Sequence, residues 1–310
     1  MCVPIVQFVK DNTAISLLPI KIRQCRFIFL IYFNVVKILT KINWLLYILF
    51  WSYSSQVYAS GEYRAVGTRI IVPGLGGVSV VSPYNPSGNQ AGMAFTESSS
   101  LSLYYANTGI AEGVNNFMAM GMYKLKKGGT LGFTGSYFGY ELFNDKKFGV
   151  GYALKLADFV SIGAQIDVLN NKIAGYASST SVTFELGTLF KVSKHVDIGA
   201  HVYNPVRAKY GKETDERIPT VFRLGATYHT NDKVWITGEL EKDLDVNLAF
   251  RAGIDYKVNE YVFLRAGFLT LPVSGSLGAG IVFKGLRIEL LGAYQKVTGF
   301  SPHLGLSYVF

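Results

Sequence analysis

Four histidines and a group of acids are the side chains of this chain that could take part in catalysis. The histidines are His195, His201, His229 and His303. No HExxH, CxxC or GxSxG motif occurs, so the spacings typical of zinc hydrolases, redox dithiols and serine hydrolases are absent. His201 could pair with Glu185 or Asp197, but a hydrogen-bonded structural histidine is the better interpretation. The segment 205–217 holds three acids and no histidine, which favours a solvated loop over a calcium site. We therefore predict no enzyme activity and no cofactor or metal.

A second group of charged residues occupies every other position of apolar segments. In 246–258, for example, Arg251 and Asp255 alternate with Val, Leu, Phe and Ile. The polar positions that we expect to share one environment include Glu185, Arg223, Glu239, Arg251, Asp255, Arg265, Arg287 and Glu289. Acids and arginines are mixed, which argues against the one-sign ring of an ion-selective pore. Two interpretations stay open: a rigid salt-bridge network, or a polar conduit or substrate site.

The elements that must position these residues are β-strands. Alternation of apolar and polar residues recurs through the chain from residue 98, whereas no useful helical period occurs. Fourteen such segments are predicted, at 98–107, 115–125, 129–140, 146–156, 159–169, 180–192, 195–204, 218–229, 233–241, 246–257, 260–270, 276–284, 286–296 and 303–310. Most are near the roughly 9–11 residues that a tilted strand needs to cross a membrane. Charged residues are only 16% of the chain, against about 25% in soluble domains.

The connections between the predicted strands differ in length by position. Every second connection is short, and the others are mostly longer, with 170–179 and 205–217 the longest. Short periplasmic turns and longer outer loops are typical of outer-membrane barrels. Since lipid offers no hydrogen bonds, the strands must close without a free edge. We therefore predict an all-β fold: a transmembrane antiparallel β-barrel of about fourteen strands in the cell outer membrane.

The carboxyl terminus fits this prediction. Leu306, Tyr308 and Phe310 occupy alternate positions up to a terminal Phe. Bacterial outer-membrane barrels commonly end in this way, because the assembly machinery reads the final strand. We predict that these three residues are the assembly signal, and that the barrel-assembly machinery and outer-membrane lipid are partners.

Residues 1–59 have a different composition from the rest. They carry six Lys and Arg against one Asp, and both cysteines of the chain. Lys37 and Lys41 precede the apolar run 42–51, and Ala59 follows, so we predict a secretory signal peptide cut near Ala59, behind an upstream extension from a mis-assigned start. A membrane anchor is the alternative. Much of the +9 net charge lies in this segment rather than in the predicted barrel, so the charge is poor evidence for a nucleic-acid partner. We therefore predict no nucleic-acid binding.

Residues 60–97 are rich in Gly, Ser and Pro and come before the barrel segment 98–310. We expect them to form a hatch inside the barrel, since many inward positions are Gly and leave room. The expected hatch motif consists of Gly76, Gly77, Asn89, Gln90, Ala91 and Gly92. No phosphate-binding Gly-rich loop is present.

The stretch Gly76-Gly77-Val78-Ser79-Val80, followed by Asn89-Gln90-Ala91-Gly92-Met93-Ala94, resembles a family opening. It is similar to the GGASVA…NPAGLA pattern of PorV/PorQ-like outer-membrane barrels of Bacteroidota, relatives of the long-chain fatty-acid transporters. The resemblance covers about 62–310. It implies a fourteen-stranded barrel with an N-terminal hatch, and a role in type IX secretion or apolar-substrate uptake.

Three functions follow as hypotheses. The first is an accessory barrel of type IX secretion that binds protein cargo or other secretion components. The alternative is a transporter or channel for hydrophobic small molecules, in which the hatch gates the lumen. The third is a purely structural barrel.

Overall fold

The computed structural model describes residues 77–83, 87–107, 113–175, 177–210, 215–296 and 298–310. The predicted signal peptide 1–59, Gly76 and the rest of 60–76 lie outside the described residues. No helix within the described ranges is long and apolar enough to cross a bilayer.

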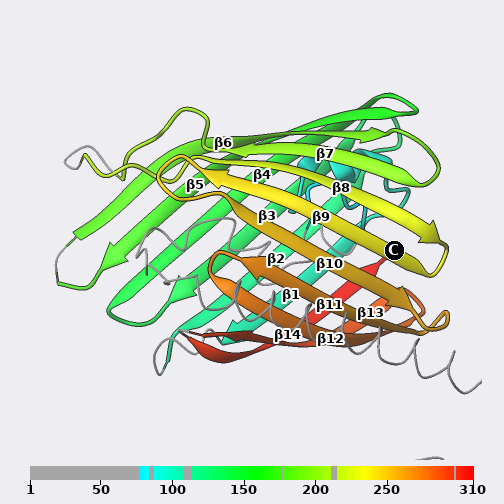
Figure 1. Cartoon of the computed structure of the whole chain (residues 1–310). Coiled ribbons are helices and arrows are strands. Elements are labelled where there is room, and N and C mark those ends of the chain that lie inside the picture. Colours follow the sequence, from blue (N-terminus) through cyan, green and yellow to red (C-terminus); the bar gives the residue numbers. More distant parts are fainter. Residues whose placement is uncertain (1–76, 84–86, 108–112, 176, 211–214, 297) are drawn as a thin grey trace, which may run out of the picture. The chain divides into compact units, whose positions relative to one another are not determined.

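The chain forms a closed antiparallel barrel of fourteen strands (Figure 1). The strands are β1 (Ser100–Asn107), β2 (Asn115–Lys124), β3 (Thr130–Gly139), β4 (Phe143–Ala157), β5 (Val160–Ile173), β6 (Ala177–Lys191), β7 (Val196–Tyr203), β8 (Val221–Asn231), β9 (Val234–Asp243), β10 (Ala249–Lys257), β11 (Val262–Thr270), β12 (Val273–Phe283), β13 (Leu286–Gln295) and β14 (Gly299–Val309). Each strand pairs with the next, and β1 pairs with β14, with Leu103 opposite Leu306. The predicted fold class and all fourteen strands are confirmed.

The alternating pattern separates the two faces of the wall. The apolar residues point outward and are exposed, for example Leu277 at 71% and Ile166 at 64%. The polar residues between them point inward, and Asp167 and Glu289 are exposed by only 0% and 2%. A continuous apolar outer surface of this size is stable only against hydrocarbon.

Outward aromatic side chains form two belts, one near each end of the barrel. At the end with the short turns they include Tyr123, Phe159, Phe190, Tyr228, Tyr256, Phe283 and Tyr308. At the opposite end they include Phe117, Phe222, Phe250, Phe268, Tyr294 and Phe300. Aromatic girdles at both interfaces are typical of barrels in the outer membrane.

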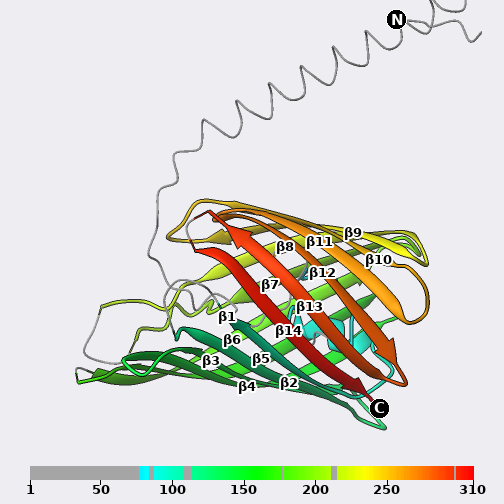
Figure 2. The same ribbon diagram turned by 90° about the horizontal axis from the view of Figure 1, so that it is seen from below.

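The predicted assembly-signal residues lie at the short-turn end. Leu306, Tyr308 and Phe310 are all exposed on the outer face, and the rings of Tyr308 and Phe310 stack at 5.9 Å between centroids. The strand that carries Leu306 and Tyr308, β14, closes the barrel against β1 (Figure 2). Their role in assembly stays a prediction.

The expected long connection at 170–179 is wrong. Strands β5 and β6 continue to Ile173 and from Ala177, and Lys172 still pairs with Ser178. Polar residues occupy both faces of this extension, so the alternation ends although the ladder continues. Outside hydrocarbon a strand needs no apolar face, and alternation therefore underestimates its length. The long connection at 205–217 is confirmed, between Tyr203 and Val221.

Candidate functional site in the barrel interior

The described part of the N-terminal region lies inside the barrel. We call residues 77–83 and 87–99 the inner segment; it contains the 3-10 helix η1 (Gln90–Phe95), drawn in cyan in Figure 2. Asn89 caps η1, because its Oδ1 accepts a hydrogen bond from the Ala91 N–H at 3.0 Å. The helix packs against the inner faces of β4, β5 and β6, and Ser161 of β5 donates to the Ala91 carbonyl at 2.8 Å.

Two inward glycines let the inner segment approach the wall closely. A Cβ at Gly187 of β6 would lie 2.0 Å from Asn89 Oδ1, and a Cβ at Gly199 of β7 would lie 2.0 Å from the Val78 carbonyl oxygen. At Gly199 the clash is with backbone, so only glycine fits there, whereas a side chain at Gly187 would require the Asn89 amide to move. We call Gly187 and Gly199 the glycine seat.

Side chains of the wall hold the inner segment by hydrogen bonds. The Val78 N–H donates to Glu239 Oε2 at 2.7 Å, and the hydroxyls of Ser79 and Thr227 lie 2.8 Å apart. All four residues are buried, and each bond joins segments far apart in the sequence. The backbone of the inner segment is therefore fixed to β8 and β9.

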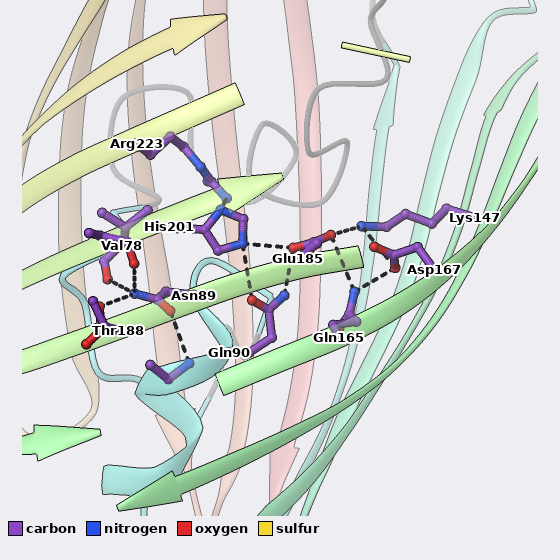
Figure 3. Close-up of polar contacts among 12 residues, drawn as sticks. Val78, Asn89, Gln90, Lys147, Gln165, Asp167, Glu185, Thr188, His201 and Arg223 are labelled. Carbon is purple, nitrogen blue, oxygen red and sulfur yellow. Dashed lines mark hydrogen bonds and ion pairs between the residues drawn. The ribbon is translucent and has the colours of Figure 1, made fainter. Parts of the chain in front are cut away.

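The Asn89 amide makes a further set of contacts with backbone oxygens. Its Nδ2 donates to the carbonyls of Val78 at 2.7 Å, Thr188 at 3.0 Å and Ala200 at 3.3 Å. Thr188 and Ala200 face each other in the β6–β7 ladder. One side chain of the inner segment thus binds two neighbouring strands of the wall (Figure 3).

A polar cluster connects η1 to the wall through Glu185 (Figure 3). Gln90 Nε2 donates to Glu185 Oε2 at 2.7 Å, and His201 Nε2 lies 2.9 Å from the same oxygen and 3.1 Å from Gln90 Oε1. Arg223 Nη2 lies 2.9 Å from His201 Nδ1. Because a guanidinium only donates, Nδ1 accepts and the ring proton is on Nε2. Both ring nitrogens are engaged, as expected of a structural histidine.

Lys147 completes this cluster from β4. Its Nζ donates to Glu185 Oε1 at 2.6 Å and lies 3.7 Å from Asp167 Oδ1, which also accepts from Gln165 Nε2 at 2.8 Å. We call Gln90, Lys147, Gln165, Asp167, Glu185, His201 and Arg223 the central cluster. Sequence reasoning did not select Lys147 as a site residue, although it is in phase with the inward positions Gly149 and Gly151.

The remaining predicted network residues form a second group across β9 to β13. Arg251 pairs with Glu241 and lies 3.7 Å from Glu239, its neighbour in the ladder. Arg265 binds Asp255 at 2.5 Å and Glu289 at 2.8 Å. Arg287 also pairs with Glu289. All eight charged residues selected from the sequence lie in the interior, Glu185 and Arg223 in the first group and six in the second.

The middle of the inner face of β2, between Asn116 and Lys124, is apolar, which the alternation pattern did not predict. Met118, Met120 and Met122 are buried on that face; we call them the methionine wall. The buried side chains around them are Tyr104, Ala106, Val114, Phe138, Leu291, Met93, Ala94 and Ala153. The segment 118–122 reads Met-Ala-Met-Gly-Met, so it lacks the polar face that alternation requires.

The long connection between β7 and β8 folds back on the barrel rim. Asn204 Nδ2 donates to the Ile218 carbonyl at 2.7 Å, and Thr183 donates to Asn204 Oδ1 at 2.7 Å. Ile218 is buried against Leu169 and Tyr203. Of the acids expected to be solvated, Asp215 is exposed beside Lys209, and Glu213 lies outside the described residues.

No family model matches the chain, and no curated protein sequence matches it. Solved structures do match. The toluene transporter TbuX of Ralstonia pickettii aligns with 72% of this chain and 92% of its own, at 12% identity and a TM-score of 0.53. The toluene transporter TodX of Pseudomonas putida aligns over 82% and 98%, at 12% identity and 0.53. A Pseudomonas aeruginosa FadL homologue aligns over 79% and 97%, at 13% identity and 0.52.

At these identities the likeness shows a shared barrel fold. The comparisons give no support to the PorV/PorQ-like assignment or to an origin in Bacteroidota.

Proposed function

We propose that this protein is an outer-membrane channel for apolar small molecules, which the inner segment closes. The observation that carries the proposal is the methionine wall inside the barrel. A porin that conducts hydrophilic solutes has a polar lumen. Here one inner face, on β2, consists of thioether side chains with aromatic and aliphatic neighbours.

Methionine suits a path for apolar molecules of varied shape. Its side chain is unbranched, flexible and polarizable, so it adapts to different ligands and contacts aromatic rings favourably. The charged residues of the second group lie on other strands and pair with one another, which leaves few free charges to attract polar solutes. The fold likeness to toluene transporters supports the same substrate class.

The inner segment is the proposed gate. It is held by hydrogen bonds rather than by covalent links: Val78 to Glu239, Ser79 to Thr227 and Gln90 to Glu185. Each such bond contributes about 0.5–1.5 kcal/mol, or about 1.5–3 kcal/mol where one partner is charged. The segment can therefore be released without unfolding the barrel.

A reversible crosslink tests the gate. The side-chain oxygens of Ser79 and Thr227 lie 2.8 Å apart, and residues 60–310 contain no cysteine, so the double variant Ser79→Cys, Thr227→Cys can form one disulfide. We expect oxidised cells that express it to take up radiolabelled toluene no faster than cells without the protein, and reduction to restore uptake. The single Cys variants are the controls. Equal uptake in the oxidised and reduced states would reject the gate.

Type IX secretion remains the competing prediction for a partner. Deleting the gene should then reduce release of type IX cargo and leave toluene uptake unchanged, whereas our proposal expects the reverse.

A further inference from the structure

The outer wall of the barrel carries a hollow of about 550 Å³ over β6 to β10. The residues that define it include Leu186, Thr188, Ala200, Phe222, Leu240 and Lys242. Its volume lies within the roughly 300–1,000 Å³ of ligand pockets. We call it the outer hollow. Nine of its twelve lining residues have outward positions on the wall, and the other three, Gly187, His201 and Arg223, are the inward residues between them in β6, β7 and β8.

The shape of the outer hollow follows from residue size. Its floor is Thr188 and Ala200, which face each other across the β6–β7 ladder. Its sides are Leu186, Phe222 and Leu240, exposed by 44%, 47% and 42%. Two small side chains surrounded by large ones leave a depression on an otherwise even apolar surface.

Hydrogen bonds from the barrel interior also fix the floor of the outer hollow. On the inner side of the same ladder, Asn89 Nδ2 donates to the carbonyls of both Thr188 and Ala200. The glycine seat residue Gly187 lies beside them, with no side chain to thicken the wall. The outer hollow is therefore a fixed depression rather than one that closes when a neighbouring strand shifts.

Lys242 stands at the edge of the outer hollow and is exposed, whereas Arg223, which also borders the hollow, points inward. Lys242 lies near the end of β9 that leads into the 244–248 connection, so it is at the same end of the barrel as the 204–220 connection. Its Nζ donates to the Val246 carbonyl at 2.6 Å, which places the ammonium at the rim. The neighbouring Asp243 is buried inward, and Asp245 is exposed in the connection. A lysine at this depth suits an interfacial anion.

We propose that the outer hollow binds one membrane lipid with an anionic headgroup, whose acyl chain lies over Thr188 and Ala200 and whose phosphate contacts Lys242. The apolar lining, the reach of the hollow up to the aromatic belt at Phe222 and the rim ammonium of Lys242 all fit this occupant. The site does not depend on transport: a barrel that conducts nothing would still bind this lipid.

The test is lipid retention by the folded full chain. The protein is equilibrated in equal amounts of phosphatidylglycerol and phosphatidylcholine, and lipids that stay bound are counted by native mass spectrometry. We expect about one retained phosphatidylglycerol per barrel. The variant Ala200→Leu fills the floor and should lose it, whereas Ala279→Leu, an exposed outward alanine of β12, should not.

A second variant tests binding of the lipid headgroup separately from binding of the acyl chain. Lys242→Gln should still retain lipid but lower the preference for phosphatidylglycerol about fivefold, which corresponds to about 1 kcal/mol for one interfacial lysine. The matched control is Lys146→Gln, an exposed lysine of β4. Equal retention by Ala200→Leu and wild type, or equal loss in Ala200→Leu and Ala279→Leu, would overturn the site. An unchanged lipid preference in Lys242→Gln would overturn the anionic headgroup.

Discussion

Glu185 is the residue on which the inner segment and the barrel wall converge. Its two oxygens accept hydrogen bonds from Gln90, Lys147 and His201, and it is only 3% exposed. The sequence predicts its inward position because it alternates with apolar residues of β6. It does not predict the bond to Gln90, since that depends on where a segment of irregular sequence lies in three dimensions.

The first prediction concerns the charge of Glu185. In Glu185→Gln the mostly buried Lys147, 12% exposed, keeps only the longer contact with Asp167, so an ammonium is left poorly compensated. Breaking a buried ion pair costs about 3–5 kcal/mol. We expect a loss of stability of that order in urea unfolding of the reconstituted barrel. Glu141→Gln, at an exposed residue between β3 and β4, should change stability by about 0.5 kcal/mol or less. A similar midpoint for both variants would contradict the role of Glu185.

The second prediction concerns the glycine seat. Gly199→Ala places a methyl group on the Val78 carbonyl, while the β7 backbone itself tolerates alanine. We expect the barrel to fold and the inner segment to be displaced. In a Ser79→Cys background, labelling by a water-soluble thiol reagent should then be faster. Gly135→Ala, where the added Cβ meets nothing within 4 Å, is the control. Unchanged labelling in Gly199→Ala would show that the contact does not position the segment.

At the scale of elements, alternation predicts a strand wherever one face meets lipid and the other meets the interior. This is why all fourteen strands follow from the sequence. The pattern fails at two places for physical reasons. The extension of β5 and β6 lies beyond the apolar zone, so polar residues occupy both of its faces. On β2 the interior itself is apolar, so Met118 to Met122 show no polar face at all.

The third prediction tests where the membrane ends on these strands. Ile166 is 64% exposed near the middle of β5, whereas Thr180 borders the extension of β6, opposite Asn170. Arginine on the lipid face costs about 2–4 kcal/mol at the midplane and about 0–1 kcal/mol near the interface. Ile166→Arg should therefore destabilise the barrel in urea unfolding in lipid vesicles, and Thr180→Arg should have little effect. An equal loss of stability in the two variants would place both residues at the same depth in the membrane. It would contradict the conclusion that the extension of β5 and β6 lies beyond the hydrocarbon.

At the scale of the whole molecule, the barrel has an apolar exterior and an interior of paired charges. The methionine wall and its buried neighbours form an apolar track within that interior. The exterior and the fold class follow from the sequence alone. The track does not, because it is recognised only when β1, β2, β3 and β13 are brought together around Met120. The proposed substrate class therefore depends on the three-dimensional arrangement rather than on any motif.

The most direct test of the account is the initial rate of uptake of radiolabelled toluene, compared with a radiolabelled sugar, in cells that carry an intact lipopolysaccharide layer. We predict that the protein raises toluene uptake and not sugar uptake. We also predict that Met120→Asp removes the increase, while the volume-conserving Met120→Leu retains it and both variants fold. Sugar uptake that rises without toluene uptake, or a folded Met120→Asp barrel that transports toluene like the wild type, would contradict an apolar path through the barrel.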